Sequence, residues 1–240
     1  MSGHSKWAKL KHFKGALDAK KSAIFTKLGH AITIAARQGG DPQINFKLRL
    51  AIENARKANL PKDNIDRAIK RGTGELAGER IEEVIYEVFG PERTAIVIQA
   101  LTDNKNRTVS NLRRIFNKYG GGLSGQNSVL WMFERKGIIK IADYQSKIIN
   151  LEDFELKTID LGAEDIKIEN GDLAVYTNLE DLEKVKQGLE KEGIEVDYAE
   201  VEWFAKDPVK ISQPTQRKID LIFAELDEDP DVNDYYTNIE

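Results

Sequence analysis

The chain has 240 residues, of which 40% are hydrophobic and 32% are charged, so it can bury apolar cores and remain very soluble. It contains no cysteine, which excludes disulfides, thiolate zinc sites and a cysteine nucleophile. Because the sequence starts basic and has no apolar run long enough for a secretory signal or a membrane span, we expect a cytoplasmic protein without a membrane partner.

Charge is distributed unevenly along the chain. Residues 1–72 contain 16 Lys and Arg and 5 Asp and Glu, a net charge of +11. The other 168 residues contain 20 Lys and Arg and 35 Asp and Glu, a net charge of −15, so the total is only −4. A molecule with this polarity attracts polyanions at one end and repels them at the other, which indicates nucleic-acid binding by the basic segment.

Two helices are expected first. Apolar side chains recur with a period of 3.6 through residues 24–35, and Gly39-Gly40 ends that pattern. Asp41-Pro42 then predicts an N-cap followed by proline at the first helical position. This second helix has Ile44 on its apolar side and ends at Leu60-Pro61.

A third, short helix has Ile65, Ala68 and Ile69 on its apolar side and completes a small bundle. The stretch that follows it, residues 72–78, reads GTGELAG and predicts a flexible hinge.

From Ile81 the period of the apolar residues changes to 2, which predicts strands. The elements expected in this part are strands at residues 85–90, 94–102 and 128–134 and a helix at about residues 107–119. One helix covers a sheet incompletely, so we expect the last helix and strand of the chain, at about residues 214–226 and 234–240, to pack on it.

Residues 137–204 alternate strands and helices in the order strand–helix–strand–strand–helix–strand, which is typical of the ferredoxin-like fold. Asn170-Gly171 between two alternating runs predicts a hairpin turn. The expected fold class is therefore α+β and multidomain, with a three-helix domain followed by two α/β domains of ferredoxin-like character. The domains expected are residues 1–78, residues 79–134 with 205–240, and residues 135–204.

Nucleic-acid contacts are expected along the basic segment, where lysines suit phosphates and aromatic rings suit bases. The candidate residues are Lys6, Trp7, Lys9, Lys11, His12, Lys14, Lys20, Lys21, Lys27, Arg37, Lys47, Arg49, Lys70 and Arg71. The alternative is a solvated tail anchored to the core by Trp7, followed by helices with ordinary charged surfaces. The excess of 16 bases over 5 acids favours binding.

A second candidate site lies between an expected strand and the helix after it. Asn104, Lys105 and Arg107 could hold a phosphate at the N-terminus of that helix. The same polar segment also offers caps for that helix, and the two roles do not exclude each other.

No metal, cofactor or catalytic site is expected. The three histidines, His4, His12 and His30, lack the spacing of metal ligands. No nucleophile with a base and no pair of carboxylates can be argued from the sequence, so we expect neither an enzyme nor a small-molecule substrate.

Asp227, Asp229 and Asp231 have the alternating spacing of a calcium loop, but Val232 stands where such a loop requires glycine. We expect instead an acidic loop that repels nucleic acid or docks on the basic segment.

With these features the sequence resembles the YebC family, which includes the mitochondrial translational activator of cytochrome oxidase. The matching stretches are GHSKW at residues 3–7, IFTKL at 24–28, PKDNIDRAIK at 61–70, GTGE at 72–75, LTDNKNRT at 101–108 and FERKG at 133–137. They span most of the chain in the expected order. One departure is FGPER at residues 89–93, where the family more often has a glycine-rich turn.

The resemblance implies three domains around a central cleft and a regulator of gene expression that binds nucleic acid, first of all a DNA-binding transcriptional regulator. Two alternatives stay open: a translation factor that binds ribosomal RNA in the ribosome and relieves stalling, and a protein–protein adaptor that uses the acidic α/β domains. No clear helix-turn-helix pair with base-reading side chains is evident, and a Lys/Trp tail suits RNA as well as DNA. We expect a monomer without a cofactor.

Overall fold

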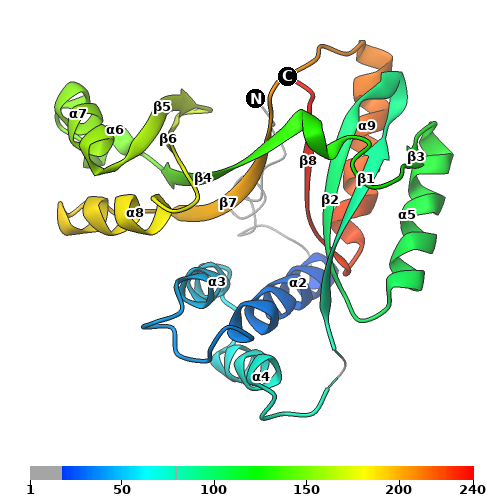
Figure 1. The fold of residues 1–240 in the computed structure, drawn as a ribbon, viewed down its shortest axis with the longest axis horizontal. Coiled ribbons are helices and arrows are strands. Elements are labelled where there is room, and N and C mark those ends of the chain that lie inside the picture. The colour runs from blue at the N-terminus through cyan, green and yellow to red at the C-terminus, as the bar shows by residue number, and fades with distance from the viewer. Residues whose placement is uncertain (1–17, 79) are drawn as a thin grey trace. The chain divides into compact units, whose positions relative to one another are not determined.

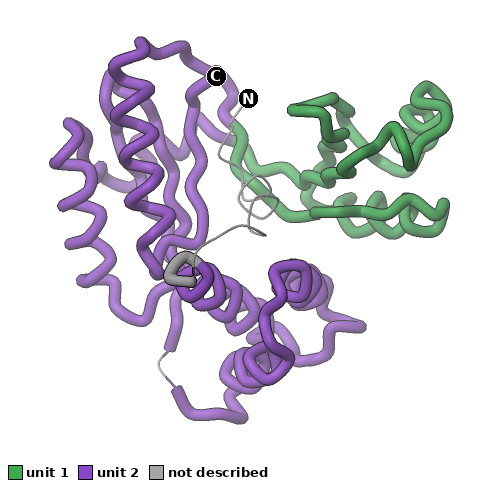
Figure 2. The backbone as a smooth tube through the Cα atoms, turned by 180° about the vertical axis from the view of Figure 1, so that it is seen from behind, with its two compact units in different colours: residues 1, 134–204 green, residues 2–133, 205–240 purple. Residues whose placement is uncertain are grey.

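A computed structural model of the chain describes residues 18–78 and 80–240, with side chains from Lys21 onward. The backbone forms two compact units (Figure 2). The smaller unit comprises residues 134–204, and the larger combines the described residues from 18 to 133 with residues 205–240. The expected division into three domains stays a prediction. None of the described helices is long and apolar enough to cross a membrane.

The first three helices that the structure describes belong to the larger unit (Figure 1): α2 (Asp18–Ala36), α3 (Phe46–Lys57) and α4 (Lys62–Thr73). Their apolar sides meet in one buried core, as the periodicity predicted. The largest buried side chains of this core are those of Leu28, Ile32, Leu48, Ile52, Leu60 and Ile65. The expected three-helix arrangement is therefore confirmed.

The second helix begins at Phe46, four residues later than predicted. Asn45 is its N-cap, because the Asn45 side chain accepts a hydrogen bond from Leu48 N at 3.0 Å. The buried Asn45 amide also donates two hydrogen bonds, of 2.8 and 2.7 Å, to carbonyls at the end of α2 and in the following turn. Asp41 has no amide group for this task. Ile44 therefore precedes the helix and is 84% exposed, so its expected apolar contact is wrong.

The rest of the larger unit is an antiparallel sheet with the strand order β3-β1-β2-β8. Its strands are β1 (Glu82–Phe89), β2 (Ala95–Thr102), β3 (Gly122–Leu123) and β8 (Val232–Thr237). The helices α5 (Lys105–Tyr119) and α9 (Gln213–Glu228) pack on this sheet side by side (Figure 1). The end of the chain therefore returns to the middle, where β8 pairs with β2 and α9 shares a core with α5.

The strand predicted at residues 128–134 is wrong for most of its length. A 3-10 turn, η3 (Leu130–Met132), occupies it, and strand β4 starts only at Phe133. The buried Glu87 carboxylate accepts hydrogen bonds from the backbone N–H groups of residues 127, 129 and 130 at 2.6–2.8 Å. These N–H groups are therefore satisfied by a side chain, so they do not pair with a strand.

The sheet of the smaller unit has the order β5-β6-β4-β7. Its elements are β4 (Phe133–Ile141), α6 (Tyr144–Lys147), α7 (Leu151–Leu161), β5 (Ala163–Glu169), β6 (Asp172–Thr177), α8 (Leu182–Lys191) and β7 (Tyr198–Ala205). β6 lies between β4 and β5 and is antiparallel to both, which confirms the ferredoxin-like order. Asn170 and Gly171 have φ values of 53° and 85°, as a tight hairpin turn requires.

Candidate nucleic-acid interface

Half of the predicted contacts precede the first described side chain. Lys6, Trp7, Lys9, Lys11, His12 and Lys14 lie outside the described residues, and so does the side chain of Lys20 in the first turn of α2. The candidates with a described environment are the seven from Lys21 to Arg71, together with the three near the start of α5.

α2 and α4 form a groove of about 600 Å³ on the surface of the bundle. Its lining residues are Lys21, Ser22, Phe25, Thr26, Gly29, His30, Thr33, Asn64, Arg67, Ala68 and Arg71. We refer to it as the α2–α4 groove. Cations come from both helices, and no Asp or Glu is among the described lining residues. The groove therefore offers positive charge and hydroxyl or amide donors without a competing carboxylate.

Close packing of the two helices positions this groove. A Cβ atom at Gly72 would lie 2.4 Å from Thr33 O, so the end of α4 can approach α2 only with glycine at that position. The hydroxyl of Thr33 donates a hydrogen bond of 3.2 Å to Ala68 O across the same contact. The two walls of the groove are therefore held by backbone contacts near its floor.

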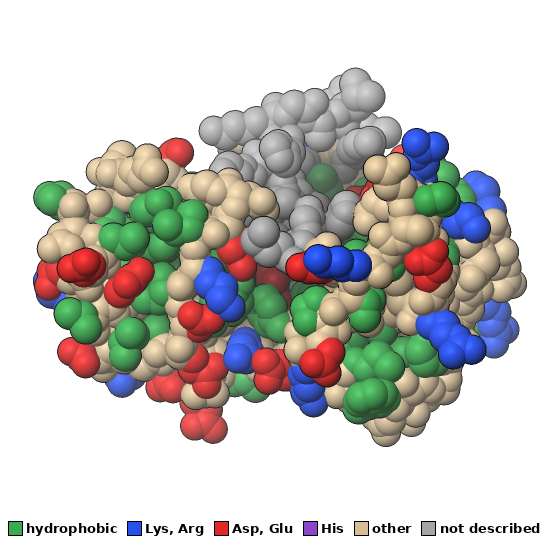
Figure 3. Space-filling model, turned by 90° about the horizontal axis from the view of Figure 1, so that it is seen from above, with side chains coloured by type: hydrophobic (Ala, Val, Ile, Leu, Met, Phe, Trp, Pro, Cys, Tyr) green, Lys and Arg blue, Asp and Glu red, His purple; other side chains and the backbone are tan. Residues whose placement is uncertain are grey.

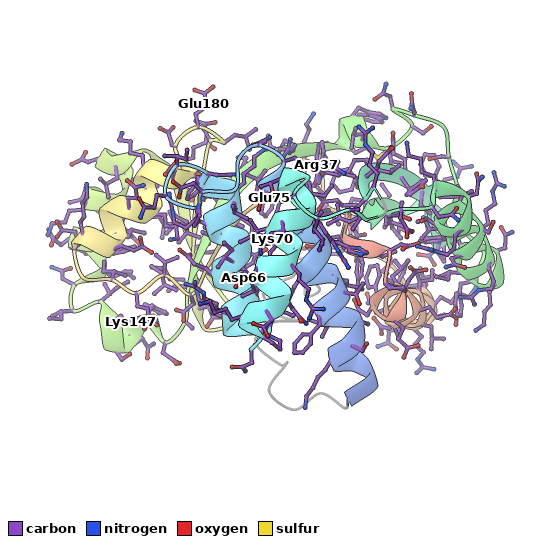
Figure 4. All side chains as sticks on the ribbon, turned by 90° about the horizontal axis from the view of Figure 1, so that it is seen from below. Arg37, Asp66, Lys70, Glu75, Lys147 and Glu180 are labelled. Carbon is purple, nitrogen blue, oxygen red and sulfur yellow. The ribbon has the colours of Figure 1, made fainter. Side chains whose placement is uncertain are left out.

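On α4 the groove-lining side chains are Asn64, Arg67 and Arg71. Arg67 Nη2 donates to Asn64 Oδ1 at 2.7 Å, which holds these two side chains side by side. Arg71 is exposed and forms no ion pair with another described residue. Lys70 lies with Asp66 along the outer surface of the helix (Figure 4). α4 thus presents a row of donors and cations over two turns.

The connection between α3 and α4 contains only residues 58–61, and Asn59 has a φ of 58°. Helix-turn-helix pairs have connections of three to four residues, often with a glycine, and Asn59 here has the positive φ that glycine adopts readily. From the sequence we predicted only that a helix ends at Leu60-Pro61, and we did not predict a helix-turn-helix pair there. The sequence feature that could have indicated such a pair is the presence of Asn64 and Arg67 in the first turns of the helix that follows the short connection.

Lys27 and Arg37, both predicted nucleic-acid contacts, join the bundle to the α/β part of the larger unit. Lys27 Nζ donates to the carbonyls of Leu226 at 3.3 Å and Asp227 at 2.8 Å, at the end of α9. A cation is favourable there because the last carbonyls of a helix carry partial negative charge. Arg37 Nη2 donates to Ile81 O, just before β1.

His30 makes a third contact of this kind. Its Nδ1 atom lies 3.1 Å from Leu101 O at the end of β2. Burial lowers the pKa of His30 below its ordinary value, and this outweighs the opposing effect of the Leu101 carbonyl. The neutral imidazole then donates Nδ1–H and adds no charge to the groove.

The two remaining predicted contacts are on α3. Arg49 Nη1 donates to the carbonyls of Pro42 at 2.9 Å and Gln43 at 3.1 Å, and its guanidinium lies 5.3 Å from the centre of the Phe46 ring. It therefore braces the turn before α3. Lys47 is exposed and has no ion pair with the described part of the chain.

The second predicted site, at the start of α5, has a structural explanation for every residue. Asn104 caps the helix, because its Oδ1 accepts a hydrogen bond from Arg107 N at 3.0 Å. Lys105 forms an ion pair of 2.5 Å with Glu82. Arg107 forms a two-pronged ion pair with Asp231, at 3.0 and 2.6 Å, and hydrogen bonds to Asp231 raise the pKa of this guanidinium further. The structure therefore shows the capping role, and phosphate binding at this site stays a prediction.

Two of the three aspartates of the expected acidic loop near the C-terminus are buried. Asp231 is 1% exposed and neutralised by Arg107, and Asp229 is 7% exposed and accepts a hydrogen bond from Asn111 at 3.0 Å. Only Asp227 is exposed. Among the residues that the structure describes, no group of His, Cys, Asp and Glu side chains could hold a metal ion.

Two family models match the chain. The model described as TACO1/YebC protein N-terminal domain matches residues 5–75, and the model described as TACO1/YebC second and third domain matches residues 81–239. A protein of Thermotoga maritima named probable transcriptional regulatory protein is 49% identical, with 100% of this chain and 94% of that protein covered. A protein of Caldanaerobacter subterraneus subsp. tengcongensis with the same description is 46% identical, with 100% and 98% covered.

A solved structure is similar as well. The crystal structure of a conserved hypothetical protein from Aquifex aeolicus matches with a TM-score of 0.86 and 41% sequence identity, covering 98% of this chain and 97% of that one. The sequence similarity and the shared fold both extend over nearly the full length. The chain therefore belongs to the TACO1/YebC family.

Proposed function

We propose that this protein is a transcriptional regulator that binds DNA through the α2–α4 groove and the exposed side of α4. The observation that carries the proposal is a groove lined by Lys21, Arg67 and Arg71 and by no described carboxylate. The relatives named probable transcriptional regulatory protein support the same function.

Phosphate contacts would supply most of the affinity. Arg67 and Arg71 are one helical turn apart and Lys21 faces them from α2, so one backbone segment of DNA can meet cations from both walls. Each neutralised phosphate releases counterions, which makes such binding strongly salt-dependent. The hydroxyl of Ser22 can add a hydrogen bond that fixes the register of the DNA.

Base contacts would come from the start of α4. Asn often forms two-pronged hydrogen bonds with adenine in the major groove. Asn64 is held in place by Arg67, and a short connection to α3 precedes it. We assign α4 the role of the reading helix, with Lys70 and Arg71 contacting the DNA backbone further along it.

The smaller unit would confine DNA to the bundle. Residues 134–204 contain 9 Lys and Arg against 19 Asp and Glu, a net charge of −10. Acidic side chains are prominent on the surface of this unit (Figure 3). DNA is therefore repelled from it.

Titration of labelled duplex DNA with the full chain at several salt concentrations tests the proposal. Changing Arg67 and Arg71 to Ala should reduce the slope of log K against log salt by about 1.8, roughly 0.9 for each lost phosphate contact. Arg113→Ala is the matched control, because Arg113 is an exposed arginine on α5 with no ion pair to another described residue. Equal slopes for the two variants would remove the groove from the DNA site.

Two further variants separate the parts of the site. Asn64→Ala should lower discrimination at one base position by about 1–3 kcal/mol and leave nonspecific affinity unchanged. Changing Lys6, Lys9, Lys11 and Lys14 to Ala tests the predicted tail contacts, which should reduce the salt slope by up to about 3.6. Preference for ribosomes over duplex DNA at equal salt would instead support the translation-factor alternative.

A further inference from the structure

The outer face of α7 exposes aliphatic side chains that the smaller unit does not use for its core. Phe154 and Thr158 on one side of the helix are buried. On the opposite side Leu156 is 66% exposed and Ile159 is 54% exposed. These two residues are neighbours on the helix surface, because they are three positions apart.

Ile149 extends this surface at the start of the helix. Asn150 is the N-cap of α7, so Ile149 stands where an apolar residue usually packs on the fourth helical residue, here Phe154. Ile149 is instead fully exposed, at 106%. No contact within the unit therefore accounts for an isoleucine at this position. Single exposed aliphatics are ordinary, whereas three along one helix indicate an interaction surface.

Carboxylates border these aliphatics. Glu152 precedes Leu156 by one turn and Asp160 follows it by one turn. Both are exposed, and neither forms an ion pair within the described part of the chain. Glu152 favours the helix because it lies in the first turn, but Asp160 lies in the last turn, where negative charge opposes the helix dipole. Helix stability therefore does not account for Asp160.

We propose that this surface, Ile149, Glu152, Leu156, Ile159 and Asp160, binds a basic amphipathic helix of a protein partner. We refer to it as the α7 outer face. Apolar side chains of the partner would cover Leu156 and Ile159, and its Lys or Arg side chains would pair with Glu152 and Asp160.

Charge favours a basic helix as the partner of the α7 outer face over a second copy of the chain or a nucleic acid. A second copy of the chain would bring two identical acidic faces together, since a symmetric contact uses the same patch on both subunits. Nucleic acid is repelled by the same carboxylates and by the net charge of −10 on the unit. A basic partner gains both the apolar contact and the charge pairing. This surface is independent of the proposed DNA site.

Fluorescence anisotropy with the full chain tests the proposal. The probe is a labelled amphipathic helical peptide of leucine and lysine, and a peptide of leucine and glutamate with the same pattern is the control probe. The double variant Leu156→Ser with Ile159→Ser should weaken binding of the lysine peptide about ten-fold. The matched control is Leu221→Ser on α9, where Leu221 is 52% exposed, and it should bind as the unchanged chain does.

A second variant tests the charges. Glu152→Gln with Asp160→Asn should weaken the lysine peptide and reduce the salt dependence of its binding. Circular dichroism confirms that each variant folds. The proposal is overturned if the lysine peptide shows no saturable binding, if it binds the serine double variant as tightly as the control, or if the glutamate peptide binds equally well. A dimer in sedimentation that the serine double variant abolishes would assign the face to a second copy and overturn it too.

Discussion

The cations of the smaller unit and those of the helical bundle are used differently. Six of the nine Lys and Arg residues of the smaller unit form ion pairs: Lys136, Lys140, Lys147, Lys157, Lys167 and Lys186. In the bundle, the side chains of five exposed cations form neither an ion pair nor a hydrogen bond with another described residue: Lys47, Arg56, Lys62, Lys70 and Arg71. Most cations of the smaller unit are therefore neutralised by carboxylates of the same unit, whereas these cations of the bundle remain available to a polyanion.

The most buried ion pair of the smaller unit shows how a lysine charge is neutralised there. Lys140 and Glu169 form an ion pair, and Tyr176 donates a second hydrogen bond to the same carboxylate. Burial alone would raise the pKa of Glu169, but the hydrogen bonds from Lys140 and Tyr176 outweigh it and lower the pKa. The Lys140 side chain is only 7% exposed, so its charge does not reach a ligand.

The largest expected effect comes from breaking that pair. Glu169→Ala should lower the free energy of unfolding by about 3 kcal/mol, because it leaves the Lys140 charge buried without a partner. Urea unfolding measures this loss. Glu180→Ala is the control, since Glu180 is exposed and has no ion pair with another described residue (Figure 4), and it should change stability by less than about 0.5 kcal/mol. A similar loss in both variants would show that pairing is irrelevant here.

Removing unpaired cations of the bundle should affect DNA binding and leave stability almost unchanged. Changing Lys70 and Arg71 to Ala should keep the free energy of unfolding within about 0.5 kcal/mol of the original, because both side chains are exposed. The same variant should bind duplex DNA about ten-fold more weakly at low salt, since two phosphate contacts are lost. Urea unfolding and DNA titration on one preparation measure both quantities. A large loss of stability would contradict the distinction between the two regions.

Glu225 of the larger unit pairs with cations, and its contribution to stability should depend on pH. Glu225 accepts hydrogen bonds from Lys118, Tyr119 and Arg114, and those from Lys118 and Tyr119 contribute most to lowering its pKa from 4.5 to about 2. A lowered pKa in the folded state stabilises the fold above pH about 4.5, and this stabilisation is lost as the pH falls toward 2.

Thermal unfolding of the original chain and of Glu225→Gln between pH 7 and pH 2 measures this contribution. We expect the difference in Tm between them to shrink as the pH falls, because a protonated Glu225 loses the same charge that glutamine lacks. A constant difference would show that the Lys118 and Arg114 contacts do not depend on charge.

The smallest expected effect concerns a carboxylate bound mainly by neutral groups. Glu92 has a φ of 54°, and it accepts hydrogen bonds from Ser212 Oγ at 2.6 Å and Thr215 Oγ1 at 2.9 Å at the start of α9. These hydrogen bonds are the largest causes that lower its pKa. Glu92→Ala should lower Tm more than Glu92→Gly, because alanine keeps the left-handed strain and glycine removes it. Equal changes in differential scanning calorimetry would contradict this account of the FGPER turn.

Local patterns in the sequence predicted most of the fold. The 3.6 period of the first helices, the Asn170-Gly171 turn and the strand–helix order of residues 137–204 each depend on neighbouring residues, and all three were correct. The two errors, at Asn45 and at residues 128–132, have one cause. In both places a buried side chain satisfies backbone groups, and its partners could not be identified from the local pattern.

The candidate site was predicted less well, for a related reason. A positive net charge shows how many cations a segment has, but not where their side chains point. Lys27 reaches carbonyls at the end of α9, and Arg37 reaches the carbonyl just before β1. Arg107 neutralises an aspartate 124 residues away, and Arg71 stays exposed. These residue types are indistinguishable in the sequence, because the partners are distant along the chain.

By itself, the sequence determined the charge polarity of the molecule, the three helices and the two α/β regions, since composition and periodicity are properties of short segments. Only the tertiary structure decided which cations are paired, where α2 and α4 form a groove, and which aliphatics of α7 remain uncovered. Those features depend on which surfaces contact each other when the chain folds. Such contacts bury some side chains and leave others exposed, although the residue types are the same in the sequence.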